Sequence, residues 1–207
     1  MDIVIVLYDG VTALDAIGPY EVLGRLPGAQ LTFAAPSPGP VRTDQGTLTL
    51  TATAALADTS PDVVLVPGGP WRVDPRAHGA IVDWVRAVDA TTTWTTAVCT
   101  GSLFLAAAGL LDGRPATTHW LAREELGRLG ATAVADRVVR DGKYVTAAGV
   151  SSGIDMALTL AALLSGEITA QAIQLGIEYD PQPPFTTGSP ETAPPELVDL
   201  LRAQFDR

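Results

Sequence analysis

The chain has 207 residues, of which 47% are hydrophobic and 17% charged, which is typical of one domain folded around an apolar core. Its formal net charge of -10 disfavours attachment to nucleic acid or to anionic lipid, so we expect neither a nucleic-acid nor a membrane partner. A single cysteine excludes a disulfide within the chain, and the N-terminus lacks the cationic start of a signal peptide. Both features favour a cytoplasmic location.

Short apolar segments alternate with helical patterns along the chain. Strands are predicted over 3–7, 31–35, 47–53, 63–66, 93–98 and 115–118, with a hairpin over 137–147 that turns at Asp141-Gly142. Helices are predicted between the first two strands, with Pro19 in the first turn, and over 80–88, 102–111, 121–129, 152–164, 169–179 and 196–205. Ser152 and Asp155 have the spacing of a capping box, and the proline-rich stretch 180–195 is predicted to be irregular. This pattern predicts one α/β domain over 1–207, with a mostly parallel sheet and helices on both faces.

Polar residues follow several of the predicted strands. Asp15 lies shortly after the first strand, Gly68 and Gly69 follow the 63–66 strand, Cys99 ends the 93–98 strand, and His119 follows 115–118. Ligands of open parallel sheets bind beyond the carboxyl ends of the strands. We therefore expect these four segments to meet at one edge of the sheet.

Cys99 is the strongest candidate among them. A strand, then Cys-Thr-Gly-Ser, then an Ala/Leu-rich helix is the layout of a nucleophile elbow. The amides and dipole of the following helix are expected to lower the pKa of the thiol and favour the thiolate. The alternative is that Cys99 is a buried and inert thiol, as most free cysteines are.

The other candidates have structural alternatives of their own. Gly69 could supply an amide to an anionic intermediate or could simply form a turn. Asp15 could accept a proton from the thiol or be an ordinary acid at a helix start, and His119 could be a base or a satisfied polar residue. Two histidines and one cysteine offer no closely spaced pair of metal ligands, so no metal is expected.

Five ordered segments, together with the tail EYDPQPPF at 178–185, resemble one known family. They are LD and GPYE at 14–21, VPGG at 66–69, AVCTGS at 97–102, ATTHW at 116–120 and TAAGVSSGIDMAL at 146–158. This set resembles the ThiJ/PfpI superfamily, and within it the isonitrile hydratase branch. The resemblance implies a flavodoxin-like sandwich and a homodimer. It also implies Cys99 as the nucleophile, Asp15 as its acidic partner, amides from Gly69 and Thr100 near the substrate, and His119 close to the cysteine.

Two departures narrow what the resemblance implies. Thr100 stands where the protease-like branch has a histidine after the cysteine, which argues against peptidase activity. The chain also resembles the ligand domain of AraC-type transcription regulators. Those proteins continue into a helix-turn-helix segment, whereas this sequence stops at Arg207, so we do not expect regulation of transcription.

These observations lead to a hypothesis of isonitrile hydration. Cys99 would attack the terminal carbon of an isonitrile, Asp15 would shuttle protons, and Thr100 would hold a water or polarise the intermediate. Trp71, Trp120 and Tyr20 are candidate walls of a narrow apolar pocket, and no metal or organic cofactor is needed. The alternatives are glyoxalase III-like or deglycase chemistry on a reactive aldehyde, and a non-catalytic sensor whose cysteine responds to oxidation.

Overall fold

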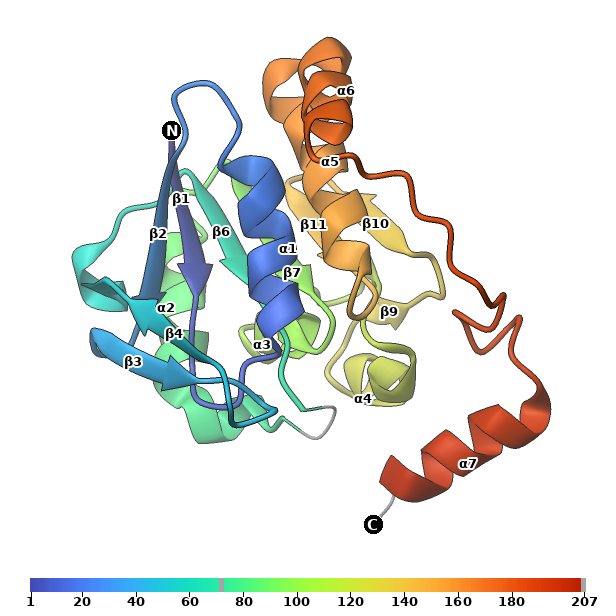
Figure 1. Cartoon of the computed structure of the whole chain (residues 1–207). Helices are drawn as coiled ribbons and strands as arrows, with labels where there is room; N and C mark the ends of the chain where they lie inside the picture. The colour runs from blue at the N-terminus through green and yellow to red at the C-terminus, as the bar shows by residue number, and fades with distance from the viewer. Residues whose placement is uncertain (71–72, 206–207) are drawn as a thin grey trace. The chain divides into compact units, whose positions relative to one another are not determined.

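The computed structural model describes residues 1–70 and 73–205, and these group into two compact units, Met1–Ile177 and Glu178–Arg207. The first unit is built on a seven-stranded sheet with the strand order β10-β11-β7-β6-β1-β2-β5 (Figure 1). The strands are β1 (Asp2–Val6), β2 (Gln30–Ala35), β5 (Ala54–Ala55), β6 (Val63–Val66), β7 (Trp94–Val98), β10 (Val138–Asp141) and β11 (Tyr144–Ala147). All pairs are parallel except the β10–β11 hairpin at one edge.

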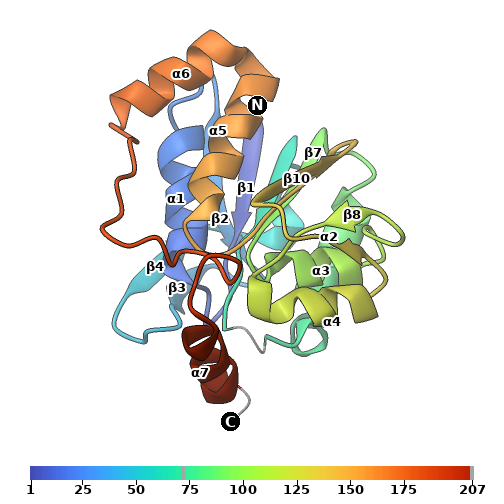
Figure 2. The same ribbon diagram turned by 90° about the vertical axis from the view of Figure 1, so that its right-hand side faces the viewer.

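The central strands are buried because both faces of the sheet are covered. All four residues of β6 are 0% exposed, as expected of a strand that reads as an unbroken run of Val and Leu. One face carries α1 (Ala13–Leu23), α5 (Ser152–Ser165) and α6 (Glu167–Gly176) (Figure 2). The other carries α2 (Gly79–Val88), α3 (Gly101–Ala107) and α4 (Arg123–Arg128). The fold is therefore the mostly parallel, flavodoxin-like α/β sandwich that the sequence predicts.

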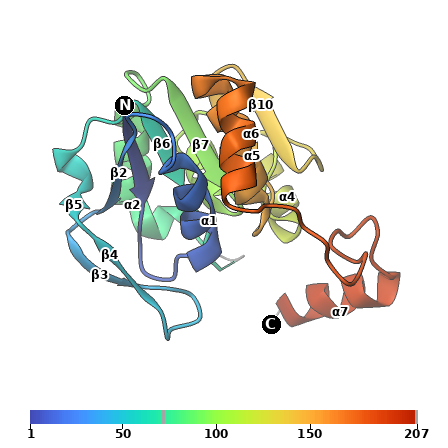
Figure 3. The same cartoon turned by 45° about the horizontal axis from the view of Figure 1, so that its top comes forward.

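Smaller elements complete the first unit. Two further two-stranded sheets pair β3 (Gly39–Arg42) with β4 (Thr49–Ala52) and β8 (Pro115–Ala116) with β9 (Thr132–Ala133). The β3–β4 hairpin lies beside the β2–β5 edge of the main sheet (Figure 3). Single 3₁₀ turns are η1 (Leu56–Asp58), η2 (Pro75–His78) and η3 (Trp120–Ala122). In the second unit an irregular segment precedes α7 (Pro195–Phe205), and no helix in the described part of the chain is long and apolar enough to span a membrane.

Four expectations about local structure were wrong. Pro19 lies inside α1 rather than in its first turn, which removes the hydrogen bond that a backbone N–H there would donate to the carbonyl of Asp15. The α3 helix ends at Ala107 rather than 111, two residues before Gly109, whose φ of +78° is incompatible with a right-handed helix. The strands predicted over 47–53 and 115–118 are the shorter β4 and β8, and both pair outside the main sheet. Ser152 forms no capping box, because its hydroxyl donates to the Gly149 carbonyl.

Candidate active site

Cys99 occupies a strained elbow between β7 and α3. Its φ is +59°, a left-handed value that few side-chain-bearing residues adopt. Its amide donates to the carbonyl oxygens of Ala147 (3.0 Å) and Ala148 (3.1 Å), at the end of β11. The strain is thus held by hydrogen bonds to the neighbouring strand, and it places a thiol that is only 3% exposed at the carboxyl edge of the sheet.

The turn after Cys99 closes tightly against β6. A Cβ built on Gly101 would collide with the backbone of Val66 and Pro67, so only glycine allows the elbow to approach the neighbouring strand this closely. This approach brings the loop after β6 beside the cysteine.

Asp15 reaches the same place from the first turn of α1. It is fully buried, and its Oδ2 accepts a hydrogen bond of 3.1 Å from the Gly68 amide. A Cβ on Gly68 would lie 2.8 Å from both Asp15 Oδ2 and Cys99 Cβ, so these two side chains flank a position that only glycine leaves open. Oδ1 of Asp15 has no hydrogen bond from any residue within 1–70 or 73–205 that meets ordinary distance and angle criteria, although its carboxyl interacts with the Cys99 thiol.

Burial sets the protonation state of this pair. It raises the pKa of Asp15 from 3.8 to about 8, against the opposing effects of its contacts with Cys99 and the Gly68 amide. The pKa of the Cys99 thiol is likewise raised well above its usual value, mainly by burial and then by the charge of Asp15, with the Thr100 amide acting in the opposite direction. The expected lowering of the cysteine pKa is therefore wrong. At pH 7 the pair consists of a carboxylic acid beside a thiol.

His119 lies next to Cys99, but it does not follow a strand of the main sheet. Thr118 donates to the carbonyl of Cys99 (2.8 Å), and Ser102 donates to the carbonyl of Thr117 (2.7 Å), which ties this segment to the elbow. A Cβ on Gly149 would lie 3.0 Å from Cys99 Sγ and would collide with Cδ2 of His119. Burial lowers the pKa of His119, and its Nδ1 accepts a hydrogen bond from the Leu121 amide (3.4 Å), so the ring is a neutral wall of the site.

Thr100 and Gly69 bind each other. The Gly69 amide donates to Thr100 Oγ1 (2.9 Å), and that hydroxyl lies 3.2 Å from the Gly69 carbonyl. The Gly69 amide is therefore already satisfied, which corrects the expectation that it faces the substrate. The Thr100 amide, by contrast, interacts with the cysteine sulfur.

The three aromatic candidates differ in position. Trp120 is half-buried and lies beside His119, with ring centroids 6.0 Å apart. Tyr20, on α1, stacks on Phe33 of β2 with ring centroids 5.2 Å apart, and its place in the wall of the pocket stays a prediction. Trp71 lies outside the described residues.

Two residues of the site were not predicted from the sequence. Gly149 lies against Cys99 Sγ, and Tyr8 donates from its hydroxyl to the Pro67 carbonyl (3.1 Å) in the loop that binds Asp15. The signal for Tyr8 was its place just after the first buried strand, at the edge where the other candidates lie. Gly149 likewise lies just after the second strand of the 137–147 hairpin.

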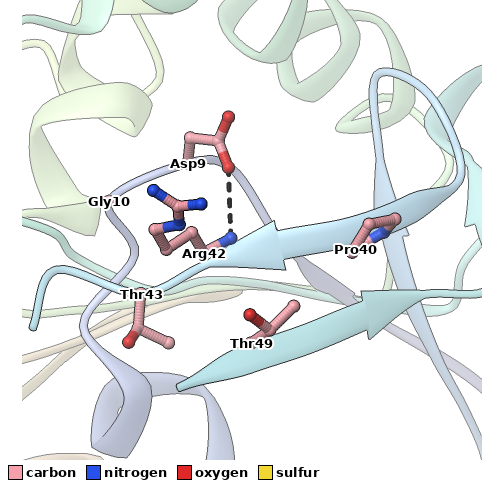
Figure 4. Close-up of a pocket in the computed structure, with 6 residues that line it drawn as sticks. All are labelled: Asp9, Gly10, Pro40, Arg42, Thr43 and Thr49. Carbon is pink, nitrogen blue, oxygen red and sulfur yellow. Dashed lines mark hydrogen bonds between the residues drawn. The ribbon is translucent and has the colours of Figure 1, made fainter. Parts of the chain in front are cut away.

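A separate cavity of about 540 Å³ lies near this edge. Its lining residues come from the loop after β1 and from the β3–β4 hairpin: Asp9, Gly10, Pro40, Arg42, Thr43 and Thr49 (Figure 4). Asp9 Oδ1 accepts a hydrogen bond from the Arg42 amide (3.1 Å), and among the described residues neither Cys99 nor Asp15, Thr100, Gly69, His119, Trp120 or Tyr20 is part of the lining. Among the described residues, no three His, Cys, Asp or Glu side chains lie together as metal ligands would.

The sheet presents a cysteine on a strained strand-to-helix turn, and a buried carboxyl lies beside it. These features place the protein among the α/β proteins that carry a cysteine at such an elbow. Residues 1–163 match the model of the DJ-1/PfpI family, and the chain belongs to that family.

Relatives found by sequence and by structure agree with this assignment. An isonitrile hydratase from Pseudomonas putida is 46% identical over 197 residues, which cover 95% of this chain and 86% of that protein. The crystal structure of a ThiJ/PfpI family protein from Pseudomonas syringae superimposes with a TM-score of 0.92 at 36% identity, covering 98% of this chain and 85% of that one. The HTH-type transcriptional regulator CdhR of Pseudomonas aeruginosa is 40% identical over 91 residues, or 42% of this chain and 26% of the regulator.

Proposed function

We propose that the protein hydrates isonitriles to N-substituted formamides, with Cys99 as the nucleophile and Asp15 as the group that carries protons. The observation that carries the proposal is the buried Asp15, which is mostly in its acid form at pH 7, beside the thiol. The similarity to the Pseudomonas putida isonitrile hydratase supports the choice of substrate.

In the first half-reaction an isonitrile R–N≡C enters with its terminal carbon between the two groups. Asp15 donates its proton to that carbon while the Cys99 sulfur forms a bond to it. The thiol proton passes to the Asp15 carboxylate, so the acid is regenerated and the product is the thioimidate R–N=CH–S–Cys99. No free thiolate is required, which suits a site that disfavours charge.

In the second half-reaction water adds to the thioimidate carbon. One water proton goes to nitrogen, and the other returns through Asp15 to sulfur as the C–S bond breaks. The products are R–NH–CHO and the free thiol. Thr100 contributes its amide to the sulfur and holds the Gly69 loop with its hydroxyl, so its proposed role is to position the cysteine rather than to bind the water.

The test uses purified protein and cyclohexyl isocyanide, with N-cyclohexylformamide identified by mass spectrometry. We expect turnover by the wild type and a loss of at least about 1000-fold in Cys99→Ala, because covalent catalysis is then impossible. Gly127→Ala, on α4 with open space around it, is the matched control and should retain wild-type turnover. Undiminished turnover in Cys99→Ala, or no formamide from the wild type, would rule the proposal out.

The same preparation separates the alternatives. Lactate formed from methylglyoxal without any formamide would favour glyoxalase-like chemistry. Peroxide-dependent oxidation of Cys99 with neither product would favour a sensor.

A further inference from the structure

The peptide between Pro67 and Gly68 is held from both sides. Its carbonyl oxygen accepts from the Tyr8 hydroxyl (3.1 Å), and its N–H donates to Asp15 Oδ2 (3.1 Å). Both groups belong to one planar amide, so rotating that plane disturbs both hydrogen bonds. Tyr8 and Asp15 are thus joined through a single rigid unit.

Tyr8 itself has little freedom to move. It follows β1, is 4% exposed, and its ring packs against Phe104 (5.1 Å between centroids) and His78 (4.9 Å). Its hydroxyl lies 3.0 Å from where a Cβ of Gly69 would stand, so glycine at position 69 leaves room for it. Burial and the charges of Asp15 and Cys99 raise the pKa of Tyr8, which keeps the phenol protonated and able to donate.

We propose that Tyr8 is a positioning residue of the Cys99 site: through the Pro67–Gly68 peptide it orients the Asp15 carboxyl toward the cysteine. The Gly68 amide makes Oδ2 the hydrogen-bond acceptor, so the acid proton lies on Oδ1, the oxygen with no donor of its own among the described residues. A donor on the carbonyl of a peptide also strengthens its N–H as a donor. This inference rests on the proposed function for its catalytic consequence but not for its effect on titration.

Tyr8→Phe keeps the ring and removes the hydroxyl. The weakened Gly68 hydrogen bond stabilises the Asp15 carboxylate less, so the pKa of Asp15 rises above about 8. Two measurements report this. The rate of Cys99 alkylation by iodoacetamide as a function of pH follows the titration of the pair, and the kcat/KM of isonitrile hydration falls at high pH when Asp15 loses its proton. We expect both curves to move to higher pH, and kcat at pH 7 to fall about 3- to 30-fold as Asp15 is less well oriented.

His78→Ala is the control, because it removes a ring contact of Tyr8 and leaves the hydroxyl in place. Its alkylation curve should match that of the wild type. If Tyr8→Phe fails to fold, 3,5-difluorotyrosine introduced at position 8 replaces it, since a more acidic phenol donates more strongly and should move both curves to lower pH. Unmoved curves, or equal shifts in Tyr8→Phe and His78→Ala, would overturn the proposal. The alkylation curve answers this even if no formamide is formed.

Discussion

Asp15 is the residue at which stability and chemistry conflict. Its folded pKa of about 8 lies far above the 3.8 of a free side chain, because burial penalises the charged form. Below about pH 4 the Asp15 carboxyl is protonated in both the folded and the unfolded chain, so its titration does not lower the free energy of unfolding. As the pH rises toward 8, the unfolded chain ionises while the folded chain does not, so the free energy of unfolding decreases over this window.

Asp15→Asn should therefore stabilise the protein at neutral pH while abolishing hydration. The amide oxygen of asparagine can still accept from Gly68, and no proton has to be held. We expect a melting temperature at pH 8 about 5 °C or more above that of the wild type, with the difference vanishing near pH 4. Thermal unfolding at several pH values measures it. Asp58→Asn, at an exposed position, is the control; an equal gain there would show that the effect is not specific to the buried site.

At the scale of elements, the site depends on how closely three backbone segments approach one another. The β7 elbow meets β6 at Gly101 and meets the segment after β11 through the Cys99 amide. The Thr118 hydroxyl then fixes the segment before η3 to the same turn. A glycine in such a contact cannot be exchanged without moving the Cys99 side chain or the backbone beside it.

Gly149→Ala tests this at the end of β11. A methyl group there would lie 3.0 Å from Cys99 Sγ and would push against the ring of His119. We expect the circular dichroism spectrum to remain that of the wild type, and both iodoacetamide reactivity and formamide production to fall at least about 10-fold. Gly127→Ala provides the matched glycine substitution in open space. Wild-type turnover in Gly149→Ala would show that the approach of His119 to Cys99 does not matter for the reaction.

For the molecule as a whole, the sheet was predictable because its central strands β1 and β6 are nearly unbroken apolar runs. The hairpin was predictable from Asp141-Gly142, where Gly142 has a φ of +59°. The elbow was predictable because strand, cysteine and helix are contiguous. Tyr8 and Gly149 could have been placed at the edge of the sheet, but their contacts with the site, and the bond between Thr100 and Gly69, could not be predicted, because each joins segments remote in sequence. The raised pKa values were also missed, since the extent of burial at Cys99 cannot be read from its neighbours along the chain.

The division of the chain into two units predicts that the first unit folds without the second. The main sheet, the site residues among the described positions and the segment that matches the DJ-1/PfpI family all lie within Met1–Ile177. The described residues 178–205 contain one helix and a proline-rich irregular segment, and the 30 residues of this unit are too few to form an apolar core of their own. A chain ending at Ile177 should therefore fold, and its iodoacetamide–pH curve should match that of the full chain.

Circular dichroism, thermal unfolding and light scattering on both chains measure the outcome. The homodimer expected from the family resemblance would be seen in the full chain. Its loss in the shorter one would place the contact between copies in 178–207. An unfolded or aggregated 1–177 chain would contradict the prediction. It would mean that the second unit contributes to the stability of the first, and that residues 1–207 act as one domain.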